Sequence, residues 1–140
     1  MSSAMGIGRI RLSDGSVLNL KICVIDVKEI GYSPFGGVNF DVKTIGGVAV
    51  ENITEEVKRL VVNRPLMPAE LPPEGWETLE IVEQQPAVAE VEVQSSRGVF
   101  VVKVVAEAVM AARNLQYRNT YNEPIYWISW VYKTSWRAKK

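Results

Sequence analysis

The 140-residue sequence predicts a mostly β fold, in which about six antiparallel strands and one helix share a single core. Apolar and polar residues alternate in several short stretches, which is typical of strands with one buried face. Turn-forming residues separate these stretches, and only one stretch has apolar residues at helical spacing. We expect the strands to form a small curled sheet or an OB-like barrel, with an open α+β sheet as the alternative.

The first half of the chain contains the clearest hairpin signal. Asp14-Gly15 lies between two apolar stretches, and this dipeptide favours tight hairpin turns because its residues tolerate positive φ angles. In the second of these strands the apolar positions change parity near Val24, which predicts a bulge there. Alternation over 38–42 predicts another strand, which we expect Gly46 and Gly47 to interrupt.

One helix is predicted directly after this region. Its cap is Asn52 or Thr54, and it should end near Asn63 because Pro65 disfavours helical geometry in the residue before it. The prolines that follow make residues 64–78 a proline-rich crossover. Neither half looks large enough to bury its own sheet, so we expect residues 1–140 to form a single domain.

The second half of the chain predicts three more strands, near 89–94, 99–105 and 125–136. Residues 104–115 allow two interpretations. Alanine and methionine favour a helix there, whereas the alternation that begins at Phe100 can continue as a strand, which we slightly prefer.

Composition excludes several classes of function. The chain contains no histidine and one cysteine, Cys23, so we expect no metal site, no cofactor and no enzyme. No apolar run approaches the length of a membrane span, and the first residues lack the zones of an export signal. We therefore expect a cytoplasmic protein without a membrane segment.

Charge is balanced overall but distributed unevenly, with 16 basic and 16 acidic residues. Between Glu51 and Glu92 ten acidic residues accompany three basic ones. From Arg113 to the end, six basic residues accompany Glu123 alone. This pattern makes the middle of the chain acidic and its end basic.

The last predicted strand carries the candidate binding residues. One face of it presents Trp130 and Trp136, and the other presents Trp127, Lys133 and Arg137. Aromatic rings beside cations suit single-stranded nucleic acid, because bases stack on rings while cations neutralise phosphates. If the upstream region pairs with this strand, it extends the same surface. The candidate residues are Arg113, Tyr117, Arg118, Trp127, Trp130, Lys133, Trp136 and Arg137.

A structural interpretation competes with this one. Aromatic residues are common fillings of a sheet that faces a core, so the face with Trp130 and Trp136 can simply be buried. The face with Lys133 and Arg137 must reach solvent, which leaves Trp127 exposed or covered by another molecule.

Two functions therefore remain, and no stretch matches a family signature. The first is a non-catalytic protein that binds single-stranded DNA or RNA through the C-terminal strand. The alternative is a structural or assembly subunit, either a homo-oligomer or a part of a larger complex, which uses the same surface as a protein interface.

Overall fold

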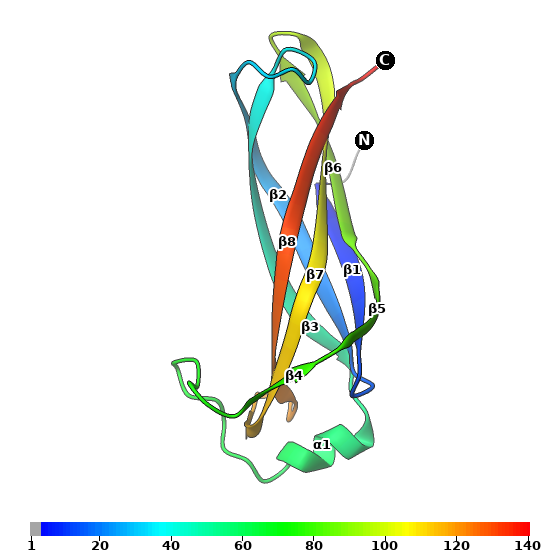
Figure 1. Ribbon diagram of the computed structural model, residues 1–140. Coiled ribbons are helices and arrows are strands. Elements are labelled where there is room, and N and C mark those ends of the chain that lie inside the picture. The colour runs from blue at the N-terminus through cyan, green and yellow to red at the C-terminus, as the bar shows by residue number, and fades with distance from the viewer. Residues whose placement is uncertain (1–3) are drawn as a thin grey trace.

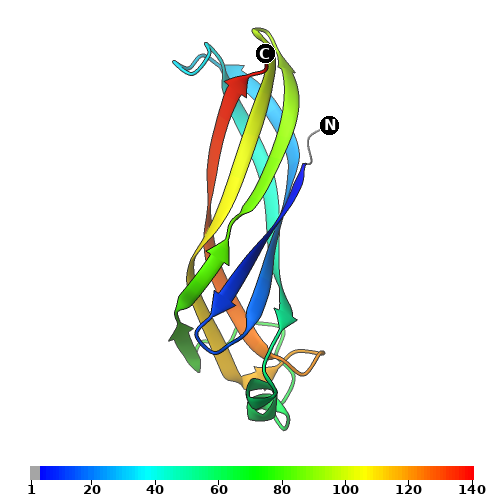
Figure 2. The same cartoon turned by 90° about the vertical axis from the view of Figure 1, so that its right-hand side faces the viewer.

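The computed structural model describes residues 4–140 as an elongated sandwich of two antiparallel four-stranded sheets (Figures 1 and 2). The prediction of a mostly β protein with one helix is confirmed. The predicted number of about six strands is wrong, because the described residues form eight. The OB-like barrel is also wrong, because the strands divide between two sheets and neither sheet closes on itself.

Sheet A has the strand order β3-β2-β1-β5. The turn at residues 13–16 joins β1 to β2, as predicted, and Gly15 has a φ of 86° there. The predicted bulge is confirmed as well, because the pairing of β2 with β3 shifts between Val24 and Asp26. The strands are β1 (Met5–Leu12), β2 (Val17–Gly31), β3 (Asn39–Asn52) and β5 (Ile81–Gln85).

Sheet B is organised around its longest strand, β7 (Gly98–Arg118). On one edge β7 pairs with β6 and, further along, with β4; on the other edge it pairs with β8. The preferred interpretation of 104–115 as strand is confirmed, because the whole segment belongs to β7. The other strands are β4 (Trp76–Leu79), β6 (Ala87–Ser95) and β8 (Pro124–Ala138).

The chain passes from one sheet to the other at Pro86, between β5 in sheet A and β6 in sheet B. Proline has no N–H to donate, so it suits a position between two ladders. Here β1 and β6 approach closely. A Cβ atom at Gly6 would lie 2.2 Å from the carbonyl oxygen of Val88, so only glycine fits at this position.

Two clusters of apolar side chains fill the space between the sheets. The larger cluster contains Leu18, Leu20 and Ile22 from sheet A and Val104 from sheet B, all almost fully buried. A second cluster, formed by Val38, Phe40, Phe100 and Val102, continues the core toward the other end of the sandwich. Burial of the apolar surface of these residues, which removes it from water, is the main contribution to the stability of such a fold.

Strand β3 runs through Gly46 and Gly47 without interruption, so the predicted break is wrong. A Cβ atom at Gly46 would lie 2.7 Å from the hydroxyl oxygen of Tyr132 and 3.1 Å from the ring of Trp130. Gly46 therefore makes room for aromatic side chains of β8 that reach across from sheet B.

Helix α1 (Glu55–Val61) covers one end of the sandwich (Figure 1). Thr54 is its cap, and its hydroxyl oxygen accepts a hydrogen bond of 3.2 Å from the N–H of Val57. Residues 62–75 connect α1 to β4, and a bridge between Leu66 and Arg118 attaches this connection to the end of β7. The last three residues of the proline-rich crossover predicted at 64–78 belong instead to β4. Among the described residues no helix is long and apolar enough to cross a membrane.

Candidate interaction surface

The two faces of β8 have different environments. Ile128 is buried, and Tyr126, Trp130 and Trp136 are half-buried against the core. The odd-numbered residues from Trp127 to Arg137 point away from sheet A, and 55% of Trp127 is exposed. The structural interpretation of the first face is therefore correct, and the second face is the one that can meet a partner.

Exposed apolar side chains surround Trp127 on the outer face of sheet B. Ala112 pairs with Trp127, and Met110 pairs with Ser129, so Met110 is a diagonal neighbour of both Trp127 and Val131. Val109 lies in the adjoining bulge of β7, where the pairing with β8 shifts. We call this surface the Trp127 face, and it consists of Val109 (54% exposed), Met110 (59%), Trp127 (55%) and Val131 (45%).

Trp136 packs against the core, although the sequence analysis predicted it as a candidate binding residue. Its ring meets the ring of Phe40 edge to face, with centroids 5.4 Å apart, and its Nε1–H donates to the carbonyl oxygen of Phe35 at 3.1 Å. Trp130 packs in the same way against the larger core cluster. Neither ring lies on the face that carries Trp127.

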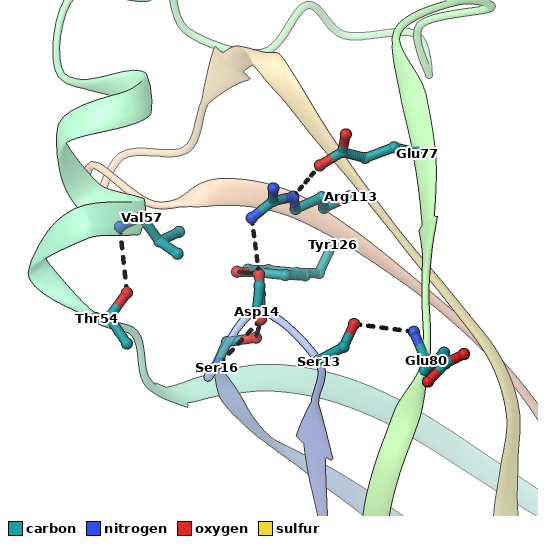
Figure 3. A network of polar contacts seen from close by, with 9 residues as sticks. All are labelled: Ser13, Asp14, Ser16, Thr54, Val57, Glu77, Glu80, Arg113 and Tyr126. Atoms are coloured by element: carbon teal, nitrogen blue, oxygen red, sulfur yellow. Dashed lines mark hydrogen bonds and ion pairs between the residues drawn. The ribbon is translucent and has the colours of Figure 1, made fainter.

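Arg113 belongs to a polar network between the two sheets (Figure 3). Its Nη1 lies 3.1 Å from Oδ2 of Asp14, and its Nε donates to Glu77. The hydroxyl of Tyr126 donates to the same Asp14 oxygen at 2.8 Å, while the N–H of Ser16 donates to Oδ1 at 2.9 Å. Only 5% of the Asp14 side chain and 14% of the Arg113 side chain are exposed. Arg113 therefore joins the β1–β2 turn to sheet B and is not a surface cation.

This network shifts the pKa values of its members. Burial raises the pKa of the Asp14 carboxyl, but hydrogen bonds from Ser16 and Tyr126 and the charge of Arg113 outweigh burial and hold the pKa below its ordinary value. Burial, together with the Asp14 carboxylate, raises the pKa of Tyr126 far above its ordinary range. Asp14 and Arg113 are therefore charged, and Tyr126 is neutral, at neutral pH.

Arg118 and Tyr117 lie at the far end of β7. Arg118 donates from Nε to the carbonyl oxygen of Arg64 at 2.8 Å and from Nη1 to Oδ1 of Asn122 at 3.1 Å, so it holds the crossover and the β7–β8 turn. Tyr117 is half-buried beside it. Of the eight candidates, only Trp127, Lys133 and Arg137 share the outward face of β8.

Two cations of the basic end of the chain pair with carboxylates of its acidic middle. Lys139 lies 2.5 Å from Glu92, and Arg113 pairs with Glu77. On the outward face, Lys133 lies 2.6 Å from Glu107 on β7. Of the two cations on the outward face of β8, Lys133 is therefore paired, whereas Arg137 has no ion pair among the described residues.

A shallow groove lies on the opposite outer face, in sheet A, with a volume of about 620 Å³. Gly47 forms part of its floor, where an added Cβ would meet nothing within 4 Å. Exposed side chains of Met5, Ile7 and Ile45 border the groove. Both outer faces of the sandwich thus present apolar surface.

The sequence did not predict the exposure of Val109 and Met110, because residues 104–115 allowed a helix as well as a strand. Their exposure follows from the bulge between Ala108 and Met110, which changes the parity of β7 against β8. No local sequence signal marks this bulge. Among residues 4–140, no three or more Cys, Asp or Glu side chains gather as a metal ion would require.

Comparisons with known proteins identified no relative of this chain. No protein-family model, no curated protein and no solved structure matches the chain.

Proposed function

We propose that the chain is a non-catalytic assembly subunit, which contacts copies of itself through the outer side of sheet B. The observation that supports this proposal is the pairing of charges around an exposed apolar surface. Lys133 already has Glu107 as its partner, whereas Trp127 and Met110 remain more than half exposed. Such a surface gains more from burial against another apolar surface than from contact with phosphates.

The shape of the molecule supports the same proposal. Both long strands that end a sheet, β3 and β8, pair on one edge only. Natural β proteins commonly protect exposed edges of this length, because such edges can pair with another chain. An assembly would cover the edges and the apolar faces together.

A cytoplasmic location remains a prediction of the sequence.

The second candidate function is the binding of single-stranded nucleic acid. Trp127 can stack on a base, and Lys103 and Arg137 lie on the same outer face without an ion pair among the described residues. Within residues 4–140, only these two cations of the outer face remain for phosphates, which makes this the weaker proposal.

Sedimentation velocity tests the first proposal. The wild-type chain should form larger species as its concentration rises from low to high micromolar. Met110→Glu should suppress them, because it introduces a charge into the Trp127 face. Leu60→Glu is the matched control, since Leu60 is 45% exposed on α1 and lies outside that face. A chain that stays monomeric throughout this range would contradict the proposal.

Titration with a labelled oligonucleotide tests the second proposal in parallel. Binding should quench tryptophan emission and weaken as salt rises, because cations on phosphates release counterions. Absence of quenching at low salt would remove this candidate.

A further inference from the structure

The free edge of β8 is available for hydrogen bonding along its whole length. Strand β8 is 15 residues long and pairs only with β7. Among the described residues, no other strand and no side chain is hydrogen-bonded to the backbone of residues 125–138. Strands of 5 to 6 residues are typical, so this edge leaves an unusually long row of backbone groups to water.

One backbone hydrogen bond fixes which residues form that row. The N–H of Lys139 donates to the carbonyl oxygen of Val99 at 2.8 Å. Hydrogen-bonded pairs alternate along an antiparallel ladder, so odd-numbered residues of β8 direct their backbone groups toward β7. Even-numbered residues, which include Tyr132 and Thr134, therefore direct their N–H and C=O groups toward the free edge.

The edge lacks two features that commonly block pairing, an internal proline and a bulge, and the charge of Lys133, a third such feature, is paired with Glu107. Its only proline is Pro124, at the first position, and the register shifts of this ladder insert their extra residues into β7. The corresponding edge strand of sheet A, β3, is less regular, because it contains Gly46 and Gly47 and carries an extra residue near Asn52. Of the two long edges, β8 is therefore the better template for another strand.

We propose that β8 pairs antiparallel with β8 of a second copy, about a twofold axis that passes through Tyr132. This proposal rests on the proposed function and adds an edge contact to the contact proposed there for the outer side of sheet B. The two sheets B would join into one continuous sheet, and the hydrogen bonds would come from the even-numbered residues. The Trp127 faces of both copies would lie side by side on one surface of that sheet.

The side chains are complementary in this register. Residues whose numbers are equally distant from 132 lie opposite each other. Trp127 then faces Arg137 of the second copy, which allows a cation–π contact, and Val131 faces Lys133 of the second copy. On the inner face the two Tyr132 side chains meet, and aromatic pairs opposite each other stabilise antiparallel strands. A register centred on Lys133 would instead oppose two lysines, which is unfavourable.

Disulfide cross-linking tests this register on the full chain. Tyr132→Cys in a Cys23→Ser background should form a covalent dimer under mild oxidation, because opposite residues of a hydrogen-bonded pair have Cα atoms about 5.5 Å apart, within the range of disulfides. Thr134→Cys in the same background is the matched control. Its two thiols would be about 13 Å apart along the strands and should not link.

A proline substitution tests the backbone contact itself. Thr134→Pro removes an N–H from the free edge and none from the β7 ladder, so it should weaken the dimer about tenfold or more. Thr134→Ala keeps the N–H, so the dissociation constant of its dimer should differ from that of the wild type by less than about threefold. Circular dichroism and thermal unfolding verify that each variant keeps the fold.

The outcomes separate this proposal from the proposed function. Efficient linking through position 132 but not 134, together with a weaker dimer for Thr134→Pro, supports the paired edges. Suppression of association by Met110→Glu but not by Thr134→Pro would overturn the paired edges and leave the assembly function intact. A wild-type chain that never associates would overturn both.

Discussion

Removal of Arg113 should destabilise the fold through the charge that it leaves behind. Arg113→Met keeps the length of the side chain but removes the guanidinium beside Asp14, whose side chain is only 5% exposed. Breaking one partner of a buried ion pair typically costs about 3 to 5 kcal/mol. Ser16 and Tyr126 would still donate to Asp14, so we expect the lower end, about 3 kcal/mol.

Urea denaturation at pH 7 measures this loss, and calorimetry should show a midpoint lower by about 9 °C for a chain of this length. Lys133→Met is the matched control. It breaks an ion pair whose side chains are 65% and 40% exposed, and such pairs contribute less than about 1 kcal/mol.

The pH dependence of this loss tests its cause. In Arg113→Met the difference from wild type should shrink as the pH falls through the pKa of Asp14, because a protonated carboxyl needs no cation. A loss below about 1 kcal/mol, or one that stays constant from pH 7 to pH 3, would refute the role of the buried charge.

Three further predictions follow from the same structure. The lowered pKa of Asp14 contributes stability that is fully present above the unfolded value of about 3.9 and is lost as the pH falls below it; Asp14→Asn should flatten the acid limb of urea midpoints measured from pH 7 to pH 2. Gly6→Ala should lower the free energy of unfolding by about 2 kcal/mol, because its methyl group would meet the backbone of β6, whereas Gly47→Ala, in open space, should change it by less than about 1 kcal/mol. Equal thermal midpoints for the two alanine variants would contradict this account. Trp127→Ala should weaken self-association in sedimentation equilibrium about tenfold or more, and an unchanged constant would exclude this ring from the contact.

Local patterns predicted most individual elements correctly. The Asp14-Gly15 turn, the bulge near Val24 and the Thr54 cap each depend on a few neighbouring residues. Their physical causes, backbone φ preferences and capping hydrogen bonds, act within one turn or strand. Local sequence patterns are therefore sufficient to predict these three features.

The division into two sheets was not predictable in the same way. It depends on Pro86, where one extended segment leaves sheet A and joins sheet B, and on the close approach of β6 to Gly6. Both involve residues about 80 positions apart, and no short-range pattern records such a contact. The barrel was expected because alternating strands alone do not distinguish a closed sheet from two packed sheets.

The candidate surface was predictable only in part. Alternation along β8 correctly separated Trp127 from Trp130 and Trp136. It could not reveal that Arg113 pairs with Asp14, because that contact joins the β1–β2 turn to β7. Long-range ion pairs of Arg113, Lys133 and Lys139 likewise neutralise part of the positive charge that the C-terminal segment carries.

Hydroxyl-radical footprinting of the wild-type chain at several concentrations tests most directly whether another copy covers the Trp127 face. Tyr121, which is 80% exposed at the β7–β8 turn, provides an internal reference. Oxidation of Trp127 should fall relative to that of Tyr121 as the protein is concentrated. A ratio that stays constant over the whole range would contradict the assembly function proposed for this surface.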